Sequence, residues 1–377
     1  MTLSAVSIQG YRSVRQLYLP VEPISIFIGA NGVGKTNLYK ALTLLRGAAD
    51  GSLTRLIAQE GGFNSVLWAG SRQKNDPVRL ILSADLEDIG DGARLRYSVE
   101  IGLKFLTEAA FDLEPLIKEE KLTARIKGRD VVMLERSGPR IVVRNADGRR
   151  EALDEDILKS ETALATIRDA GQYPELDKVR RELLGWRLYH DFRTDEASPL
   201  RQPCFGITTP TLSADGHDLA AVLATIAKIR EDTVELDAAI DDAFPGARLG
   251  SHIENGRCFF DLTFPDMPRA FAAHELSDGT LKYLCLLGAL MGYRLPPLIA
   301  LNEPEASLHP SLLPPLARLI AHAAQKSRIW IVTHSEIFAA ALLDETGKKA
   351  RRVVKRNGAT EIEGLKLTGV FSDDEED

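Results

Sequence analysis

A glycine-rich turn between a short apolar run and an amphipathic segment constrains the fold of this chain most. Residues 29–36, Gly-Ala-Asn-Gly-Val-Gly-Lys-Thr, match the pattern G-x-x-x-x-G-K-[ST] without a mismatch. Residues 24–28 are suited to a buried strand, and the apolar residues after Thr36 recur at helical spacing. Such a strand–loop–helix unit turns backbone N–H groups towards a phosphate. The alternative, a turn that binds no ligand, fits these two flanks poorly.

The side chains at the end of this turn suit a nucleoside triphosphate. Lys35 can reach the β- and γ-phosphates, and the Thr36 hydroxyl can bind Mg²⁺. The sequence therefore predicts a site for a phosphorylated nucleotide and its metal ion at residues 29–36.

Three later segments contain polar residues that could complete such a site. An apolar strand is predicted to end at Asn302 and Glu303, where a carboxylate could orient or deprotonate a water molecule. A second such strand, residues 329–333, ends at His334, and Ser277 precedes an apolar helix. Taken singly, each has a plain structural alternative: an acidic surface turn, a core histidine and a helix N-cap.

The order of predicted elements indicates an α/β protein. Strands and helices alternate from residue 280 to residue 344, which is typical of a parallel sheet with crossover helices. Residues 78–150 instead show short alternating strands separated by turns, which predict an antiparallel region. Residues 151–185 and 216–243 have helical periods, and strands are expected again at 248–254 and 257–264. We therefore expect a split α/β core (1–72 and 266–377), an antiparallel β region (73–150), a helical or mixed insertion (151–265) and an acidic tail (371–377).

Composition and charge bear on the class of partner, the state of the cysteines and the compartment expected for the protein. The net charge is -7, and the last five residues supply -5 of it, so the rest of the chain is nearly neutral and favours no class of charged partner. Cys204, Cys258 and Cys285 are too far apart in sequence for a metal motif and are expected to be buried thiols. No apolar run is long enough for a membrane span and no secretory signal is visible, so a cytoplasmic protein is expected.

The succession of motifs resembles a known family. The phosphate loop is followed, after a long insertion, by Leu-Ser-Asp-Gly-Thr (276–280), Asn-Glu-Pro-Glu (302–305), Ser-Leu-His-Pro (307–310) and Val-Thr-His-Ser (332–335). This order is similar to that of the ABC-type ATPase heads of the RecF, SMC and OLD group, most of all the AAA_21-type predicted ATPases. Gln-Gly-Tyr-Arg-Ser (9–13) resembles the first strand motif of that group. The resemblance implies a P-loop NTPase with the architecture of an ABC-ATPase head.

The same resemblance implies roles for individual residues. Glu303 would be the general base of ATP hydrolysis, His334 would sense the γ-phosphate, and residues 307–309 would lie at a dimer seam. Ser277 and Gly279 would contact ATP held by the opposite subunit, so an ATP-dependent homodimer is implied. Mg²⁺ would be held by Thr36 and Asn302. The remaining implied nucleotide contacts are Gly29, Ala30, Asn31, Gly32, Val33, Gly34, Lys35, Asn37 and Arg12.

The sequence departs from the family pattern at one position and leaves another open. Asn302 stands where the family has an aspartate, so Mg²⁺ should be held less firmly and turnover should be slow. The glutamine of the Q-loop is either Gln59 or Gln73.

Several downstream functions stay open. The partner is expected to be either DNA or a separately encoded effector protein that the nucleotide state would gate. The basic run 348–356 could hold a phosphate backbone or form a charged edge strand. A transporter subunit is the less favoured alternative, and a built-in nuclease is not expected.

Overall fold

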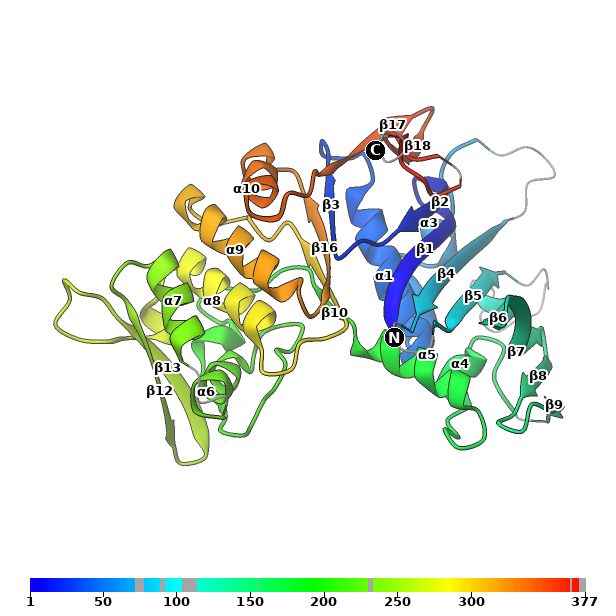
Figure 1. Cartoon of the computed structure of the whole chain (residues 1–377), viewed down its shortest axis with the longest axis horizontal. Helices are drawn as coiled ribbons and strands as arrows, with labels where there is room; N and C mark the ends of the chain where they lie inside the picture. The colour runs from blue at the N-terminus through cyan, green and yellow to red at the C-terminus, as the bar shows by residue number, and fades with distance from the viewer. Residues whose placement is uncertain are drawn as a thin grey trace. The chain divides into compact units, whose positions relative to one another are not determined.

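The computed structural model describes residues 1–71, 78–88, 92–103, 114–154, 156–229, 233–366 and 368–372 (Figure 1). The contacts within the chain divide it into two compact units. Unit 1 comprises Met1–Glu22, Gly29–Trp186 and Arg351–Asp377, and unit 2 comprises Pro23–Ile28 and Arg187–Ala350. Each unit is thus assembled from segments that are distant in sequence. Within the described ranges, no helix is both long and apolar enough to cross a membrane.

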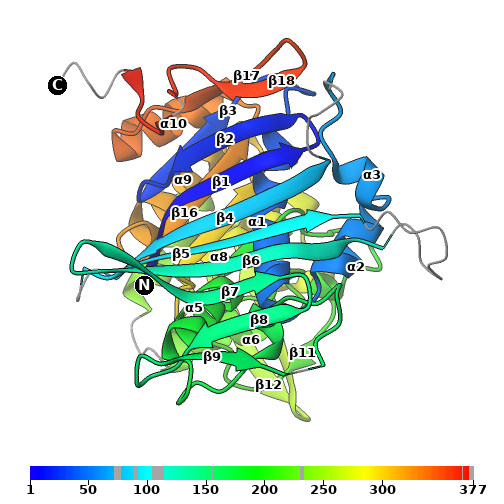
Figure 2. The same ribbon diagram turned by 90° about the vertical axis from the view of Figure 1, so that its right-hand side faces the viewer.

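Unit 1 is built on an eight-stranded antiparallel sheet in the order β2-β1-β4-β5-β6-β7-β8-β9. Buried and more exposed residues alternate along strands such as β5, which gives the sheet an apolar and a polar face. Figure 2 shows the strands side by side, from the blue β2 to the green β9. The strands are β1 (Thr2–Tyr11), β2 (Val14–Pro20), β4 (Arg79–Glu87), β5 (Arg94–Gly102), β6 (Leu116–Ile126), β7 (Arg129–Ser137), β8 (Arg140–Arg144) and β9 (Arg150–Leu153).

Helices pack on the apolar face of this sheet. The longest, α1 (Lys35–Asp50), buries Leu38, Leu42 and Leu45 on one side. Gly51 follows it with a φ of 84°, a left-handed conformation that ends the helix. It contacts β1 and β4, and α5 (Pro174–Gly185) contacts β5 and β7. The short helices of unit 1 are α2 (Leu53–Gln59), α3 (Phe63–Val66) and α4 (Ala163–Thr166).

A buried ion pair fastens the sheet of unit 1 to the segment before α5. The Glu120 carboxylate accepts hydrogen bonds from the Ala163 N–H at 2.6 Å and from the Tyr97 hydroxyl at 2.9 Å. Arg136 lies 4.0 Å from Glu120 and donates to the Leu158 carbonyl at 3.0 Å. Burial raises the pKa of Glu120, and these donors oppose that rise. Breaking such a buried pair typically costs ~3–5 kcal/mol.

A C-terminal hairpin also belongs to unit 1. It consists of β17 (Arg351–Arg356) and β18 (Ala359–Ile362), joined by the two-residue turn Asn357-Gly358. Both turn residues have positive φ, 50° and 81°, as a type I′ turn requires. The hairpin contacts β2.

Unit 2 contains a parallel sheet with strand order β10-β15-β16-β3. Its strands are β3 (Ile24–Ile28), β10 (Arg187–Tyr189), β15 (Leu298–Asn302) and β16 (Arg328–Thr333). Every residue of β3 and β15 is buried, as expected for strands covered on both faces. Asn302 lies opposite Val332, and Thr333 lies opposite Ile28. The carboxyl ends of the three strands therefore meet at one edge.

Helices and a small antiparallel sheet complete unit 2. Helix α8 is buried at every residue from 281 to 291. The three cysteines are free and buried, as predicted. The other helices are α6 (Leu219–Ile229), α7 (Val234–Ala243), α8 (Asp278–Met291), α9 (Leu313–Ala323) and α10 (Glu336–Thr346), and the strands are β11 (Cys204–Phe205), β12 (Arg248–Glu254), β13 (Arg257–Thr263) and β14 (Phe271–Ala272).

The predicted fold class, an α/β protein with an antiparallel β region, is confirmed. The expectation of helix throughout 151–185 is wrong in its first half, where β9 and a loop precede α4 and α5. The predicted ATPase core, 1–72 and 266–377, stays a prediction, because compact units and functional regions need not share boundaries. Most of the acidic tail, 373–377, lies outside the described residues.

Candidate functional site

The phosphate loop of unit 1 has the backbone conformation that its glycines allow. Gly34 has a φ of 102° and precedes the first residue of α1. A Cβ atom on Gly29 would lie 2.4 Å from the Val353 carbonyl oxygen, so only glycine fits there. Ala30 and Asn31 are exposed, whereas Val33, Thr36 and Asn37 are half-buried. The loop and the N-terminus of α1 are thus arranged as an anion site would be.

Lys35 is turned back over this loop. It is 4% exposed, and its ammonium group donates to the Gly29 carbonyl at 2.5 Å and to the Ala30 carbonyl at 2.9 Å. These two carbonyls accept the hydrogen bonds that a buried ammonium group requires. A triphosphate would offer the same group stronger, charged acceptors.

Arg12, a predicted nucleotide contact, is bound to a carboxylate of its own unit. It follows β1, has a left-handed φ of 49°, and its guanidinium lies 2.5 Å from the Glu60 carboxylate. The Tyr11 hydroxyl donates to the same carboxylate at 2.8 Å. Burial, reinforced by Glu60, raises the pKa of Tyr11 far above its ordinary value, so Tyr11 is a neutral donor.

The carboxyl edge of the parallel sheet gathers the predicted catalytic residues of unit 2. Glu303 follows β15 with a left-handed φ of 49°, and its N–H donates to the Val332 carbonyl at 2.7 Å. His334 follows β16, and its Nδ1 lies 3.5 Å from the Glu303 carboxylate. Asn302 is 8% exposed, and its Oδ1 is buried without a hydrogen-bond partner in the described part of the chain. β3 ends at this edge too, and Gly29 is the next residue of the chain.

Glu305, which is the first alternative to Glu303 as the base and was not among the predicted site residues, joins this group. It is 7% exposed, and its carboxylate accepts hydrogen bonds from the Thr333 hydroxyl and, at 3.3 Å, from the His334 N–H. The His334 Nδ1 lies 3.7 Å from it. The sequence signal was available: a second acidic residue stands two positions after Glu303.

The segment before α8 places Ser277 and Gly279 at a helix start. Ser277 caps the helix, accepting a hydrogen bond from the Thr280 N–H at 3.2 Å, and is exposed. Gly279 lies beside the predicted seam residues, because a Cβ atom on it would be 3.0 Å from the Ser307 carbonyl oxygen. The N-cap explanation is therefore correct for Ser277, and it leaves the hydroxyl at the surface.

The residues present fit Mg²⁺ bound together with phosphates. Among the described residues, no group of three or more His, Cys, Asp or Glu side chains could hold a metal ion alone. Mg²⁺ ordinarily takes one or two protein ligands and completes its shell with phosphate oxygens and water. The unpartnered Oδ1 of Asn302 can accept from a metal-bound water.

Two other predicted features are the Q-loop glutamine and the basic run 348–356. Gln59 is exposed at the end of α2, and Gln73 lies outside the described residues. In the basic run, Arg351 lies over the Phe371 ring and 3.7 Å from the Glu22 carboxylate, and Arg356 pairs with Glu361 and Glu363. Two of these charges are thus paired with carboxylates of the same unit.

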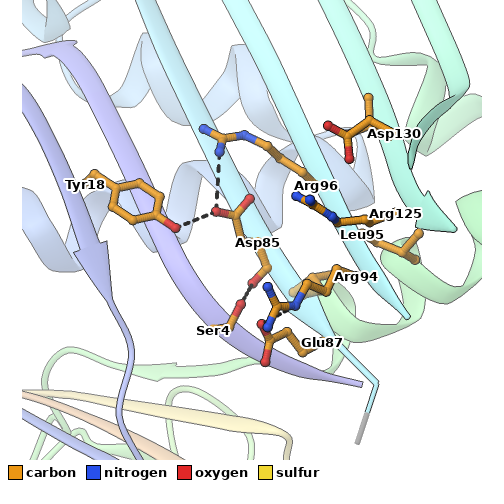
Figure 3. A pocket seen from close by; sticks show the side chains of 11 residues that line it. Ser4, Tyr18, Asp85, Glu87, Arg94, Leu95, Arg96, Arg125 and Asp130 are labelled. Atoms are coloured by element: carbon orange, nitrogen blue, oxygen red, sulfur yellow. Dashed lines mark hydrogen bonds and ion pairs between the residues drawn. The ribbon is translucent and has the colours of Figure 1, made fainter. Parts of the chain in front are cut away.

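A polar pocket of about 210 Å³ lies on the exposed face of the large sheet (Figure 3). Tyr18 donates to Asp85 at 3.0 Å, and Arg96 lies 3.5 Å from the same carboxylate. Burial raises the pKa of Asp85, which these two neighbours oppose. The three arginines that line the pocket face an equal number of carboxylates, so it selects neither anions nor cations.

Comparison with known proteins identifies the family. The AAA_21 family model, described as "AAA domain, putative AbiEii toxin, Type IV TA system", matches residues 24–340. The DNA replication and repair protein RecF of Renibacterium salmoninarum is 38% identical over 80 residues, which are 19% of this chain and 20% of RecF. The chain thus spans about a fifth of the length of this curated relative.

Solved SMC heads share the fold. An SMC head bound to the C-winged helix domain of ScpA has a TM-score of 0.55 at 15% identity, over 98% of this chain and 99% of that chain. The SMC head of Pyrococcus furiosus, with an extended coiled coil and bound to the C-terminal domain of ScpA, has a TM-score of 0.50 at 14% identity, over 100% and 99%. The chain therefore belongs to the AAA_21 family and shares the fold of SMC heads.

Proposed function

We propose that the chain binds ATP with Mg²⁺ at residues 29–36 and hydrolyses it between two copies of itself. The observation that carries the proposal is the phosphate loop of unit 1. Its backbone has the required left-handed glycine, a helix begins directly after it, and the buried Lys35 ammonium lies over it. Membership of an ATPase family supports the choice of nucleotide.

The family resemblance suggests the role of each further residue. Thr36 and, through a water molecule, Asn302 would hold Mg²⁺, which neutralises phosphate charge when bound. Glu303 would accept the proton of the attacking water, and His334 would contact the γ-phosphate. Ser277 and Gly279, with the N-terminus of α8, would form half of an anion site for the other copy's ATP. The asparagine at 302 supplies no negative charge, so turnover should be slow.

The work that ATP drives is proposed to be a DNA transaction in repair or phage defence. The match to RecF, a DNA replication and repair protein, supports this choice. SMC heads bound to ScpA support the alternative, a gate for a partner protein. Phosphate release measured with duplex DNA, with single strands and without DNA distinguishes the two, because only a DNA-coupled enzyme should be stimulated by DNA alone.

Calorimetry with ATP and Mg²⁺ tests the nucleotide site. Lys35→Ala should weaken ATP binding by about 10–100-fold, since it removes charged hydrogen bonds to phosphate. Lys178→Ala, at an exposed lysine of α5, is the matched control and should bind as the wild type does. Equal affinity in the two variants would show that the loop is not the site.

A further inference from the structure

The phosphate loop rests on the C-terminal hairpin, more than 300 residues away in sequence. Thr360, on β18, is 2% exposed. Its hydroxyl donates to the Val33 carbonyl inside the loop at 2.7 Å, and its N–H donates to the Ser13 carbonyl at 2.6 Å. All three residues belong to unit 1. Ser13 and Thr360 both lie outside residues 24–340, which the family model matches.

The side chains around Thr360 form a hydrogen-bond chain with one direction. The Asn37 amide donates to the Ser13 hydroxyl at 2.7 Å, and the Ser13 and Thr360 hydroxyl oxygens are 2.7 Å apart. Each hydroxyl has one proton to donate. Because the proton of Thr360 goes to Val33, that of Ser13 goes to Thr360, and Ser13 accepts from Asn37. The chain therefore runs from Asn37 through Ser13 and Thr360 to Val33.

This hydrogen-bond chain determines which way the peptide group between Val33 and Gly34 faces. In a trans peptide the carbonyl and the following N–H point in opposite directions. Since the Val33 carbonyl faces Thr360, the Gly34 N–H faces away from the hairpin. N–H groups of consecutive loop residues that point to one side are what binds a phosphate in such loops. A Cβ atom on Gly34 would lie 2.0 Å from the Thr360 hydroxyl oxygen, so the hairpin packs directly against the loop.

We propose that Thr360 is a positioning residue for the nucleotide, which holds the phosphate loop in its binding conformation through the Val33 carbonyl. This inference rests on the proposed function, because the ligand of the loop is ATP. It assigns the C-terminal hairpin to the nucleotide site through the hydrogen bonds of Thr360 to the loop and to Ser13.

The test is calorimetric ATP–Mg²⁺ affinity in the full chain. Thr360→Val keeps the shape of the side chain and removes its hydroxyl, so the Val33 carbonyl loses its donor and ATP affinity should fall about tenfold. Thr360→Ser restores the hydroxyl and should rescue binding. Thr225→Val is the matched control, because Thr225 is 3% exposed and donates to the Ala221 carbonyl within unit 2. Ser13→Ala breaks the chain at another link and should also weaken binding.

The outcomes separate the two proposals. If the wild type binds no ATP, the proposed function fails. If the wild type binds ATP and Thr360→Val binds equally well, only the role of Thr360 is overturned. Thermal unfolding is followed for each variant, and if Thr360→Val does not fold, Thr360→Ala, which also lacks the hydroxyl, decides: wild-type affinity in that variant overturns the inference, and weaker binding that Thr360→Ser does not share supports it.

Discussion

Glu303 and Asn302 place one carboxylate and one buried amide at the end of β15. A left-handed φ is unfavourable for a residue with a Cβ atom, by roughly 1–3 kcal/mol. Glu303 has this conformation, and its N–H is bound to the next strand of the sheet. The strain is consistent with a side chain whose direction matters for the proposed reaction.

Replacing this carboxylate should stop turnover and spare binding. In Glu303→Gln the amide cannot accept the proton of water, so the hydrolysis rate should fall ~10²–10⁴-fold while ATP stays bound. Phosphate release and calorimetry measure the two effects separately. Glu196→Gln, at an exposed glutamate, is the control. Undiminished turnover in Glu303→Gln would show that another residue is the general base, and Glu305 would be tested first.

A buried carboxyl in α5 should make stability depend on pH. Glu182 in α5 is 7% exposed, and burial raises its pKa from 4.5 to about 7. The folded state then binds more protons than the unfolded state between these values, so the free energy of unfolding falls as pH rises through that window. Glu182→Gln should abolish this fall and stabilise the protein by about 3 kcal/mol at pH 8. Urea unfolding from pH 5 to pH 8 measures it, with Glu175→Gln of the same helix as control.

At the scale of elements, Arg201 holds the loop before α8 on both sides of Ser277. Arg201 donates to the Leu276 carbonyl at 2.8 Å, to the His274 carbonyl at 3.0 Å and to the Asp278 carboxylate at 2.7 Å. These acceptors flank Ser277 on both sides. Arg201 therefore fixes the start of the helix that presents the proposed half-site.

Loss of this arginine should impair the half-site and leave the nucleotide loop intact. Arg201→Met should retain ATP binding and hydrolyse ATP more slowly, whereas Arg193→Met, at an exposed arginine, should behave as the wild type. Mixing Arg201→Met with Lys35→Ala should restore part of the turnover. In a mixed dimer, one site combines the intact phosphate loop of the Arg201→Met copy with the intact half-site of the Lys35→Ala copy. No recovery on mixing would contradict the assignment of the two halves to different subunits.

The elements show what the sequence could and could not predict. Strand β3, the loop and α1 were predictable because glycines, a buried run and helical spacing coincide within 30 residues. The apolar strands β15 and β16 were equally clear. Strand β10 is only three residues long, and the contact of Thr360 with Val33 joins positions 327 apart, so neither leaves a local pattern. The role of Ser277 as a cap was predictable, whereas its support by Arg201 depends on tertiary structure.

At the scale of the whole molecule, the proposal requires two copies. Ser277 and Gly279 offer an exposed hydroxyl, a backbone N–H and a helix N-terminus, which together make half of an anion site. Under the proposed function, this half-site would face ATP bound to a second subunit. A two-fold dimer would build both sites from one self-complementary contact, and bound ATP would be part of the interface. The dimer should therefore be weak without nucleotide.

Light scattering of Glu303→Gln with ATP and Mg²⁺, with ADP and without nucleotide tests this claim most directly. The account predicts a dimer with ATP and a monomer in the other two states. Ser277→Arg, added to the same variant, should prevent association and leave ATP binding unchanged. A Glu303→Gln protein that stays monomeric at micromolar concentration with saturating ATP and Mg²⁺ would contradict the account, and so would one that is dimeric in all three states.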